Sequence, residues 1–122
     1  MAVIKRFEEI NAWQKARELV RDVYRSCAAG PIAKDYGLKD QLCRAAVSSM
    51  SNIAEGFARR TDKDFAHFLD VAKGSAIEVQ SLLYVALDVG YFAEGEFQHL
   101  FKTVEELTSL IGGFATYLRR VR

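Results

Sequence analysis

Hydrophobic side chains recur every three or four residues along most of the chain, the spacing that places them on one face of an α-helix. Short breaks divide this pattern into four segments, which predict helices over about 11–28, 38–57, 62–89 and 95–120. No segment shows the sustained alternation of apolar and polar residues that is typical of a strand. Four helices with short connections predict an all-α fold, an antiparallel up-down-up-down four-helix bundle. We expect one domain to occupy residues 1–122.

Turn and capping signals set the expected helix boundaries. Gly30-Pro31 is a strong helix breaker and ends the first helix near residue 28. Thr61 resembles an N-cap with Asp64 three residues later, and Gly90 follows the third helix at a position that favours glycine. Three further glycines fall inside helical patterns, where we expect a neighbouring helix to approach closely: Gly74, Gly112 and Gly113. A kink in the last helix is the alternative for the final two.

The predicted third helix is apolar on more than one side. With successive residues 100° apart, one stripe forms the expected core face and a second apolar stripe lies beside it. The second stripe consists of Val71, Leu82, Val85 and Val89. A helix that is apolar all round must be buried all round, and three neighbours in one small bundle cannot cover it. The second stripe therefore predicts contact with another subunit, with scattered surface hydrophobic residues as the alternative.

A line of polar residues follows one face of the predicted second helix, at steps of three or four residues. The line consists of Gln41, Arg44, Ser48, Asn52 and Glu55, and Arg59 follows it as an ion-pair candidate for the glutamate. Unpaired buried polar groups cost about 1–3 kcal/mol each, so such a line usually forms a hydrogen-bonded network. Arg44 and Glu55 lie too far apart to pair, and each is expected to find a partner on another element. A ligand or nucleic-acid site is the alternative.

Composition and charge narrow the function classes. Half of the residues are hydrophobic, 27% are charged and the net charge is +1, as in a globular protein. The positive charge comes from residues 1–60, whereas 61–90 are net acidic, a complementarity that would help set docking register. Basic residues gather near the chain ends and after the second helix, at Lys5, Arg6, Arg59, Arg60, Arg119, Arg120 and Arg122. They are candidate nucleic-acid contacts, and the alternative is that they complement helix dipoles.

The sequence lacks the usual signatures of an enzyme or a metal protein. Cys27 and Cys43 form no C-x-x-C motif, so we expect free thiols and neither zinc nor a disulfide. His67 and His99 belong to no metal-binding or catalytic pattern, and no nucleotide fingerprint occurs. We therefore predict no catalytic residue, no metal, no cofactor and no small-molecule substrate. No apolar run suits a secretory signal or a membrane span, which predicts a cytoplasmic protein.

Two consecutive stretches carry a family resemblance, QLCRAAVSSMSNIAEGFARR and FAHFLDVAKGSAIEVQSLL. They resemble the bacterial four-helix-bundle family linked to proteins encoded in intervening sequences of 23S ribosomal RNA genes. The most specific pieces are Arg44-Ala45-Ala46 with Ser48, residues 52–56 with Arg59, and Phe68-Leu69 with residues 72–75 and Glu78. The resemblance implies a closed up-down bundle that assembles into a ring-like homopentamer.

The chain is also similar, more distantly, to the accessory protein of diversity-generating retroelements. That relative is a pentameric barrel that binds nucleic acid and a reverse transcriptase. Its net charge is markedly positive, unlike that of this chain. We therefore expect a non-enzymatic homo-oligomeric protein, with nucleic acid as a candidate partner. The alternative is an adaptor that uses the apolar face of the third helix for a foreign protein.

Overall fold

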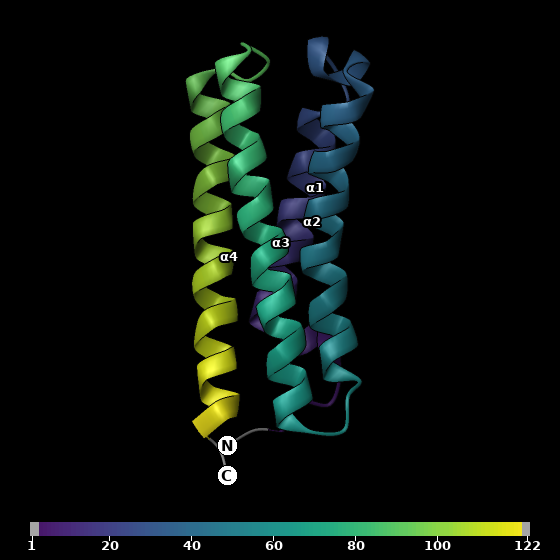
Figure 1. The fold of residues 1–122 in the computed structure, drawn as a ribbon, viewed down its shortest axis with the longest axis vertical. Coiled ribbons are helices and arrows are strands. Elements are labelled where there is room, and N and C mark those ends of the chain that lie inside the picture. Colours follow the sequence, from purple (N-terminus) through teal and green to yellow (C-terminus); the bar gives the residue numbers. More distant parts are fainter. Residues whose placement is uncertain (1–2, 121–122) are drawn as a thin grey trace.

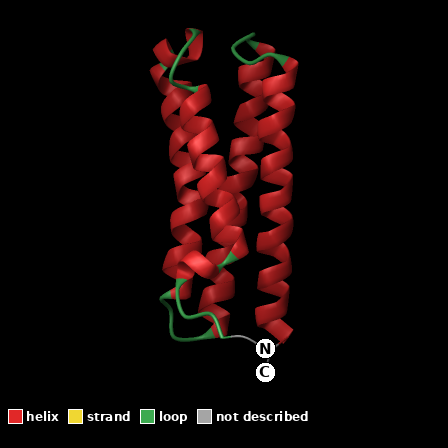
Figure 2. Ribbon diagram, turned by 180° about the vertical axis from the view of Figure 1, so that it is seen from behind, coloured by secondary structure: helices red, strands yellow, loops and turns green. Residues whose placement is uncertain are grey.

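A computed structural model describes residues 3–120 as a four-helix bundle (Figure 1). Helix α1 spans Asn11–Ser26, α2 spans Tyr36–Phe57, α3 spans Asp62–Asp88 and α4 spans Glu94–Arg120. Two short 3₁₀ turns, η1 at Phe7–Glu9 and η2 at Pro31–Lys34, precede α1 and α2. Each helix packs against the next, and α1 also packs against α4, which closes the bundle. The described residues contain no strand (Figure 2), so the predicted all-α bundle is confirmed.

Local hydrogen bonds explain where the helices begin and end. The Thr61 hydroxyl accepts a hydrogen bond from the Asp64 backbone N–H at 3.1 Å, the predicted N-cap of α3. Gly90, just after α3, has the predicted left-handed backbone, with a φ of 82°. Helix α2 begins two residues earlier than predicted, because Asp35 caps it by accepting from the Leu38 N–H at 3.1 Å.

The end of α1 also differs from the prediction. The last helical residue is Ser26 rather than residue 28. The Cys27 N–H still bonds to the Val23 carbonyl, but the Ala28 N–H bonds three residues back to Arg25. The chain thus tightens into a turn two residues before Gly30, whose φ of 78° then redirects it.

The core runs along the bundle axis and draws on all four helices. Leu19, Leu42, Leu69 and Leu107, one from each helix, are completely buried. The core stripe that the spacing predicts for α3 is buried except for Phe68 and Leu87, which are half-buried. It consists of Phe65, Phe68, Leu69, Ala72, Ala76, Val79, Leu83, Ala86 and Leu87. In α4 the helical spacing predicts an apolar stripe of Phe97, Leu100, Phe101, Val104, Leu107, Ile111, Phe114, Leu118 and Val121. Its members are buried or half-buried as far as Leu118, and Val121 lies outside the described residues.

Glycine plays a different part in packing from the one predicted. A Cβ at Gly74 or Gly113 would meet no atom within 4 Å, and at Gly112 it would meet only the Lys73 Nζ at 3.6 Å. The expected close helix approach at these positions is therefore wrong. The close approach lies at Gly56, where a Cβ would sit 2.7 Å from the Phe68 Cβ and 2.9 Å from a Phe65 ring carbon. Helices α2 and α3 come together there.

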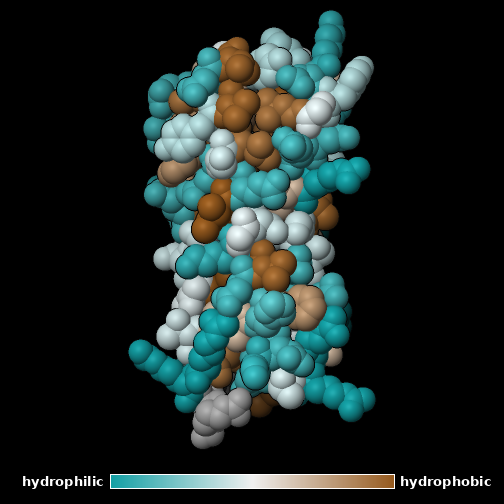
Figure 3. All heavy atoms as spheres, viewed as in Figure 1, coloured by the Kyte–Doolittle hydropathy of each residue, from teal (hydrophilic) through white to brown (hydrophobic). Residues whose placement is uncertain are grey.

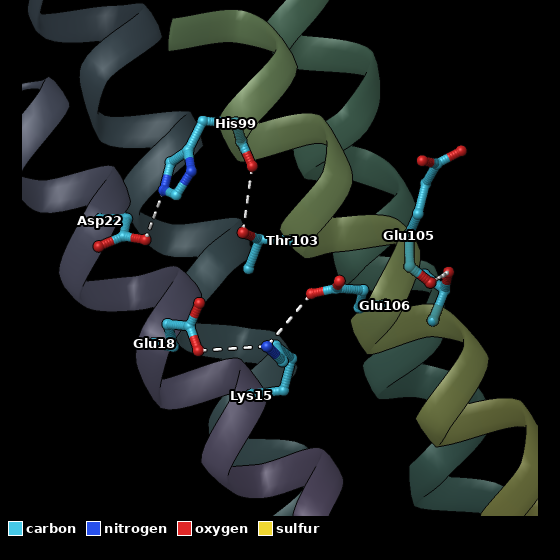
Figure 4. A network of polar contacts seen from close by, with 8 residues as sticks. Lys15, Glu18, Asp22, His99, Thr103, Glu105 and Glu106 are labelled. Atoms are coloured by element: carbon cyan, nitrogen blue, oxygen red, sulfur yellow. Dashed lines mark hydrogen bonds and ion pairs between the residues drawn. The ribbon is translucent and has the colours of Figure 1, made fainter.

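Polar side chains cross the seam between α1 and α4 (Figure 4). The Lys15 ammonium bridges the carboxylates of Glu18 and Glu106, at 3.2 Å from each. Farther along the seam, the His99 Nε2 lies 3.1 Å from an oxygen of Asp22. These groups are partly exposed, so each contact contributes modestly to stability and mainly fixes how α4 lies against α1.

The described residues show neither a membrane-spanning helix nor a cluster of metal ligands. None of the helices in this range is both long and apolar enough to cross a lipid bilayer. Within the same range, no three His, Cys, Asp or Glu side chains converge in a way that would hold a metal ion. Cys27 and Cys43 are both free and buried.

Candidate self-association face and basic end

The polar line of α2 and the second apolar stripe of α3 lie on the same side of the bundle. The hydroxyl oxygens of Ser48 and Ser75 are 2.8 Å apart, which fixes the antiparallel register of the two helices. On α2, the other members of the polar line lie on the helix face that Ser48 occupies. On α3, Val71 and Leu82 lie within about a third of a turn of Ser75, and so does Val89, the residue that follows the helix. We call this combined surface the α2–α3 face, formed by Gln41, Arg44, Ser48, Asn52, Glu55, Val71, Leu82, Val85 and Val89.

The apolar part of the α2–α3 face is open to solvent. Val71 is 40% exposed, Val85 44% and Val89 56%, while Leu82 is half-buried between the helices. Figure 3 shows hydrophobic patches, interrupted by polar side chains, along the face of the bundle that Figure 1 also presents. Three exposed valines at helical spacing along one helix form a stripe and are not isolated surface residues.

The other flank of α3 is exposed to a similar degree, but one of its side chains has aromatic contacts within the subunit. Ile77 and Tyr84 are each 49% exposed, but the Tyr84 ring packs against two phenylalanines of α4. Its centroid lies 5.0 Å from that of Phe97 and 5.6 Å from that of Phe101. Aromatic contacts within the subunit therefore hold Tyr84 on the α4 side, whereas within residues 3–120 no aromatic contact holds the valines on the α2 side.

The middle of the polar line is hydrogen-bonded within the subunit. The Asn52 side-chain amide donates to the Ser48 carbonyl at 2.8 Å and lies 3.1 Å from the Ser48 hydroxyl. With the contact between Ser48 and Ser75, this gives a small network that joins α2 to α3. The part of the line nearest the α3 packing surface is thus satisfied internally.

The two ends of the line behave differently from the expectation that each charge pairs with another helix. Glu55 forms an ion pair at 2.9 Å with Arg59, just after α2 on the same stretch of chain. Within residues 3–120, Gln41 and Arg44 have no hydrogen-bond or ion-pair partner. Leu42 and Ala46 are fully buried two residues to either side of Arg44, so Arg44 is turned about 200° from both and points outward.

The topology brings the predicted basic clusters to one end of the bundle. The segment before η1, the turn between α2 and α3 and the end of α4 all lie at the lower end in Figure 1. We call this the basic end, with Lys5, Arg6, Arg59, Arg60, Arg119 and Arg120. Arg122 lies outside the described residues.

Half of these cations already have an anionic partner. Arg6 pairs with Glu8 at 3.1 Å, Arg59 with Glu55, and Arg119 with Asp70 at 2.6 Å. The Arg119 guanidinium lowers the pKa of the Asp70 carboxyl by hydrogen bonding to it. In the part of the chain that the structure describes, the side chains of Lys5, Arg60 and Arg120 have no ion-pair partner.

The sequence predicts neither of two hollows at the basic end. The larger, of about 480 Å³, is lined by aromatic side chains from α2, α3 and α4, by aliphatic side chains, and by the polar stretch that includes Arg59 and Arg60. The smaller, of about 380 Å³, is lined by Lys63, His67, Leu118 and Arg119. Their lining residues come from separate segments of the chain, so no local sequence motif predicts these hollows. The sequence pattern marks the phenylalanines only as core residues.

A closed antiparallel four-helix bundle with an open apolar face is the class of protein that these features define. Within that class, the chain belongs to the family described as 23S rRNA-intervening sequence protein, whose sequence profile matches residues 8–113. This membership confirms the resemblance noted in the sequence.

One solved structure with the same fold is a protein of unknown function from the S23 ribosomal protein family of Bacteroides thetaiotaomicron. It is 19% identical to this chain, with a TM-score of 0.76, and the match covers 84% of this chain and 95% of that one. At that identity the likeness establishes the fold alone. A comparison with curated protein sequences gave no match.

Proposed function

We propose that the protein is a non-enzymatic scaffold that assembles with copies of itself through the α2–α3 face. The observation that carries the proposal is the row of Val71, Val85 and Val89, each 40–56% exposed along one helix. Covering the exposed part of these side chains in an interface would contribute on the order of 1 kcal/mol each. The family resemblance supports a ring of five subunits.

The polar residues of the same face fit this proposal. Gln41 and Arg44 have no partner in the described chain and point away from the core beside the apolar stripe. A neighbouring subunit would supply acceptors for them, which favours one docking arrangement over others. The hydrogen-bonded serines and Asn52 would remain internal and keep the two helices in register.

Replacing Val85 with Glu tests the proposed face. A carboxylate in an apolar interface costs several kcal/mol unless it is paired, so we expect the variant to sediment as a monomer. The matched control is Val47→Glu, which places the same charge at a 39%-exposed valine on another side of α2 and should retain assembly. Circular dichroism checks that both variants fold. A V85E protein that is folded and still assembled would contradict the proposed face.

Nucleic acid is the second proposed partner, and the basic end supports it. Lys5, Arg60 and Arg120 are unpaired in the described chain, and a ring would multiply these few charges by its number of subunits. We expect binding to structured RNA or duplex DNA to fall steeply between two salt concentrations. Replacing Arg119, Arg120 and Arg122 with Ala should weaken it several-fold. Absence of binding at low salt, or no change in the triple variant, would contradict this partner.

An adaptor for a foreign protein is the alternative use of the α2–α3 face. It predicts that the purified protein is a monomer, because the apolar stripe would then bind a different protein and not a second copy of this chain. A catalytic role finds little support in the two histidines, since His67 and His99 lie on different helices and His99 is engaged with Asp22.

A further inference from the structure

The two hollows at the basic end adjoin each other. Leu118 of α4 lines both, and the consecutive residues Asp62 and Lys63 at the start of α3 line one each. The larger hollow has a largely apolar and aromatic lining with two arginines and one aspartate, and the smaller one is lined mostly by basic side chains. The pair therefore offers two chemically different compartments side by side.

Aromatic rings line part of the larger hollow. The Phe65 ring lies 5.1 Å from Phe114 and 6.2 Å from Phe57, centroid to centroid, both in edge-to-face geometry. Phe57 and Phe114 are half-buried, so part of each ring borders the hollow. A volume of about 480 Å³ exceeds that of one planar heterocycle. Stacking on such rings contributes about 1–3 kcal/mol per nucleic-acid base and tolerates any base.

The cations around the hollows outnumber the anions. Arg59 and Arg60 line the larger hollow, and Lys63 and Arg119 line the smaller one together with His67. Asp62 is the single carboxylate among the described lining residues of these two hollows. This balance favours an anionic group, and guanidinium and ammonium groups are the usual donors to phosphate oxygens.

Two of these arginines already form ion pairs with carboxylates, but a phosphate could replace the carboxylates as their partner. Arg59 and Glu55 are 44% and 55% exposed, and Arg119 and Asp70 are 52% and 54% exposed. Exposed pairs of this kind contribute only a few tenths of a kcal/mol to about 1 kcal/mol. A phosphate can therefore compete for both guanidinium groups at little cost to the fold.

We propose that the adjoining hollows bind a nucleoside phosphate unit, with its base on the phenylalanines and its phosphate among Lys63, His67 and Arg119. The inference rests on the proposed association with nucleic acid and names the part of the nucleic acid that is recognised. The same chemistry is present in a free mononucleotide and in an unpaired stretch of a strand. A fully paired duplex offers phosphates but no accessible base face.

Fluorescence anisotropy with a labelled single-stranded 12-nucleotide probe tests the site, with AMP as a competitor and a duplex of the same sequence as comparison. Phe57→Leu removes a ring but retains apolar volume, and we expect it to weaken single-strand binding at least fivefold while leaving duplex binding unchanged. Lys63→Ala should weaken single-strand binding about as much and flatten its salt dependence. The matched control is Lys34→Ala, an exposed lysine at the opposite end of the bundle, which should change binding less than twofold.

The outcomes separate this inference from the proposed function. Competition by AMP would identify a mononucleotide site, and binding of the strand without competition would identify a strand site. Binding that is equal for strand and duplex and unaffected in F57L and K63A would overturn the hollows while leaving nucleic-acid association intact. Absence of binding to any probe at low salt would overturn both. Thermal unfolding of each variant shows whether a lost affinity reflects a lost fold.

Discussion

At the scale of single residues, the two cysteines are buried side by side, and burial changes their acidity. Cys27 is 1% exposed at the end of α1, and Cys43 of α2 is 9% exposed. Burial, together with the neighbouring Cys43 thiol, raises the pKa of Cys27 to about 12, and burial also raises the pKa of Cys43. Since the thiolate is the reactive form, both residues should be inert in the folded protein. The sequence predicts two free thiols but does not indicate that they are neighbours.

The shifted pKa of Cys27 predicts how stability depends on alkaline pH. The folded state holds the thiol proton more tightly than the unfolded chain, whose thiol titrates near 9. The resulting stabilisation is fully present below pH 9 and is lost as the pH rises toward 12. We expect urea unfolding of the wild type to lose more stability between pH 8 and 10.5 than that of Cys27→Ala. Parallel pH profiles for the two proteins would contradict the shift.

At the scale of elements, the contact between α2 and α3 depends on one glycine that the sequence did not single out. Periodicity, Thr61 and Gly90 predicted the helices well because they reflect local geometry. The close approach of two helices depends on their tertiary packing. The sequence alone therefore does not distinguish Gly56, where another helix comes close, from Gly74, where none does. The Asp35 cap was missed for a related reason, since it lies in a connection of irregular turns.

Substitution of these two glycines tests the packing. Gly56→Ala should destabilise the protein by about 1–3 kcal/mol, because its Cβ would overlap the Cβ of Phe68 and the ring of Phe65. Gly74→Ala, at a site with open space, should stabilise it by up to about 1 kcal/mol through helix propensity. Urea unfolding of both variants measures the difference. Equal effects at the two positions would show that α2 and α3 are not in close contact at Gly56.

At the scale of the whole molecule, topology assembles features that are separate in the sequence. Antiparallel packing sets the polar line of α2 beside the valines of α3 and brings the basic clusters to one end. The sequence predicted each set of residues, but not that Gln41 and Arg44 would share a face with Val71, Leu82, Val85 and Val89. That placement requires the register between helices, which the contact between Ser48 and Ser75 fixes. The hollows around Leu118 depend on tertiary packing in the same way.

The exposed apolar stripe on α3 indicates that this protein assembles with copies of itself. The most direct test of this assembly is the molar mass of the wild-type protein, measured by light scattering on a sizing column at micromolar concentration. We predict a single species with a mass several times that of the 13.7 kDa chain, and five times that mass if the ring has the size the resemblance implies. A mass of 13.7 kDa at every concentration tested would contradict self-association and leave the α2–α3 face to a foreign partner.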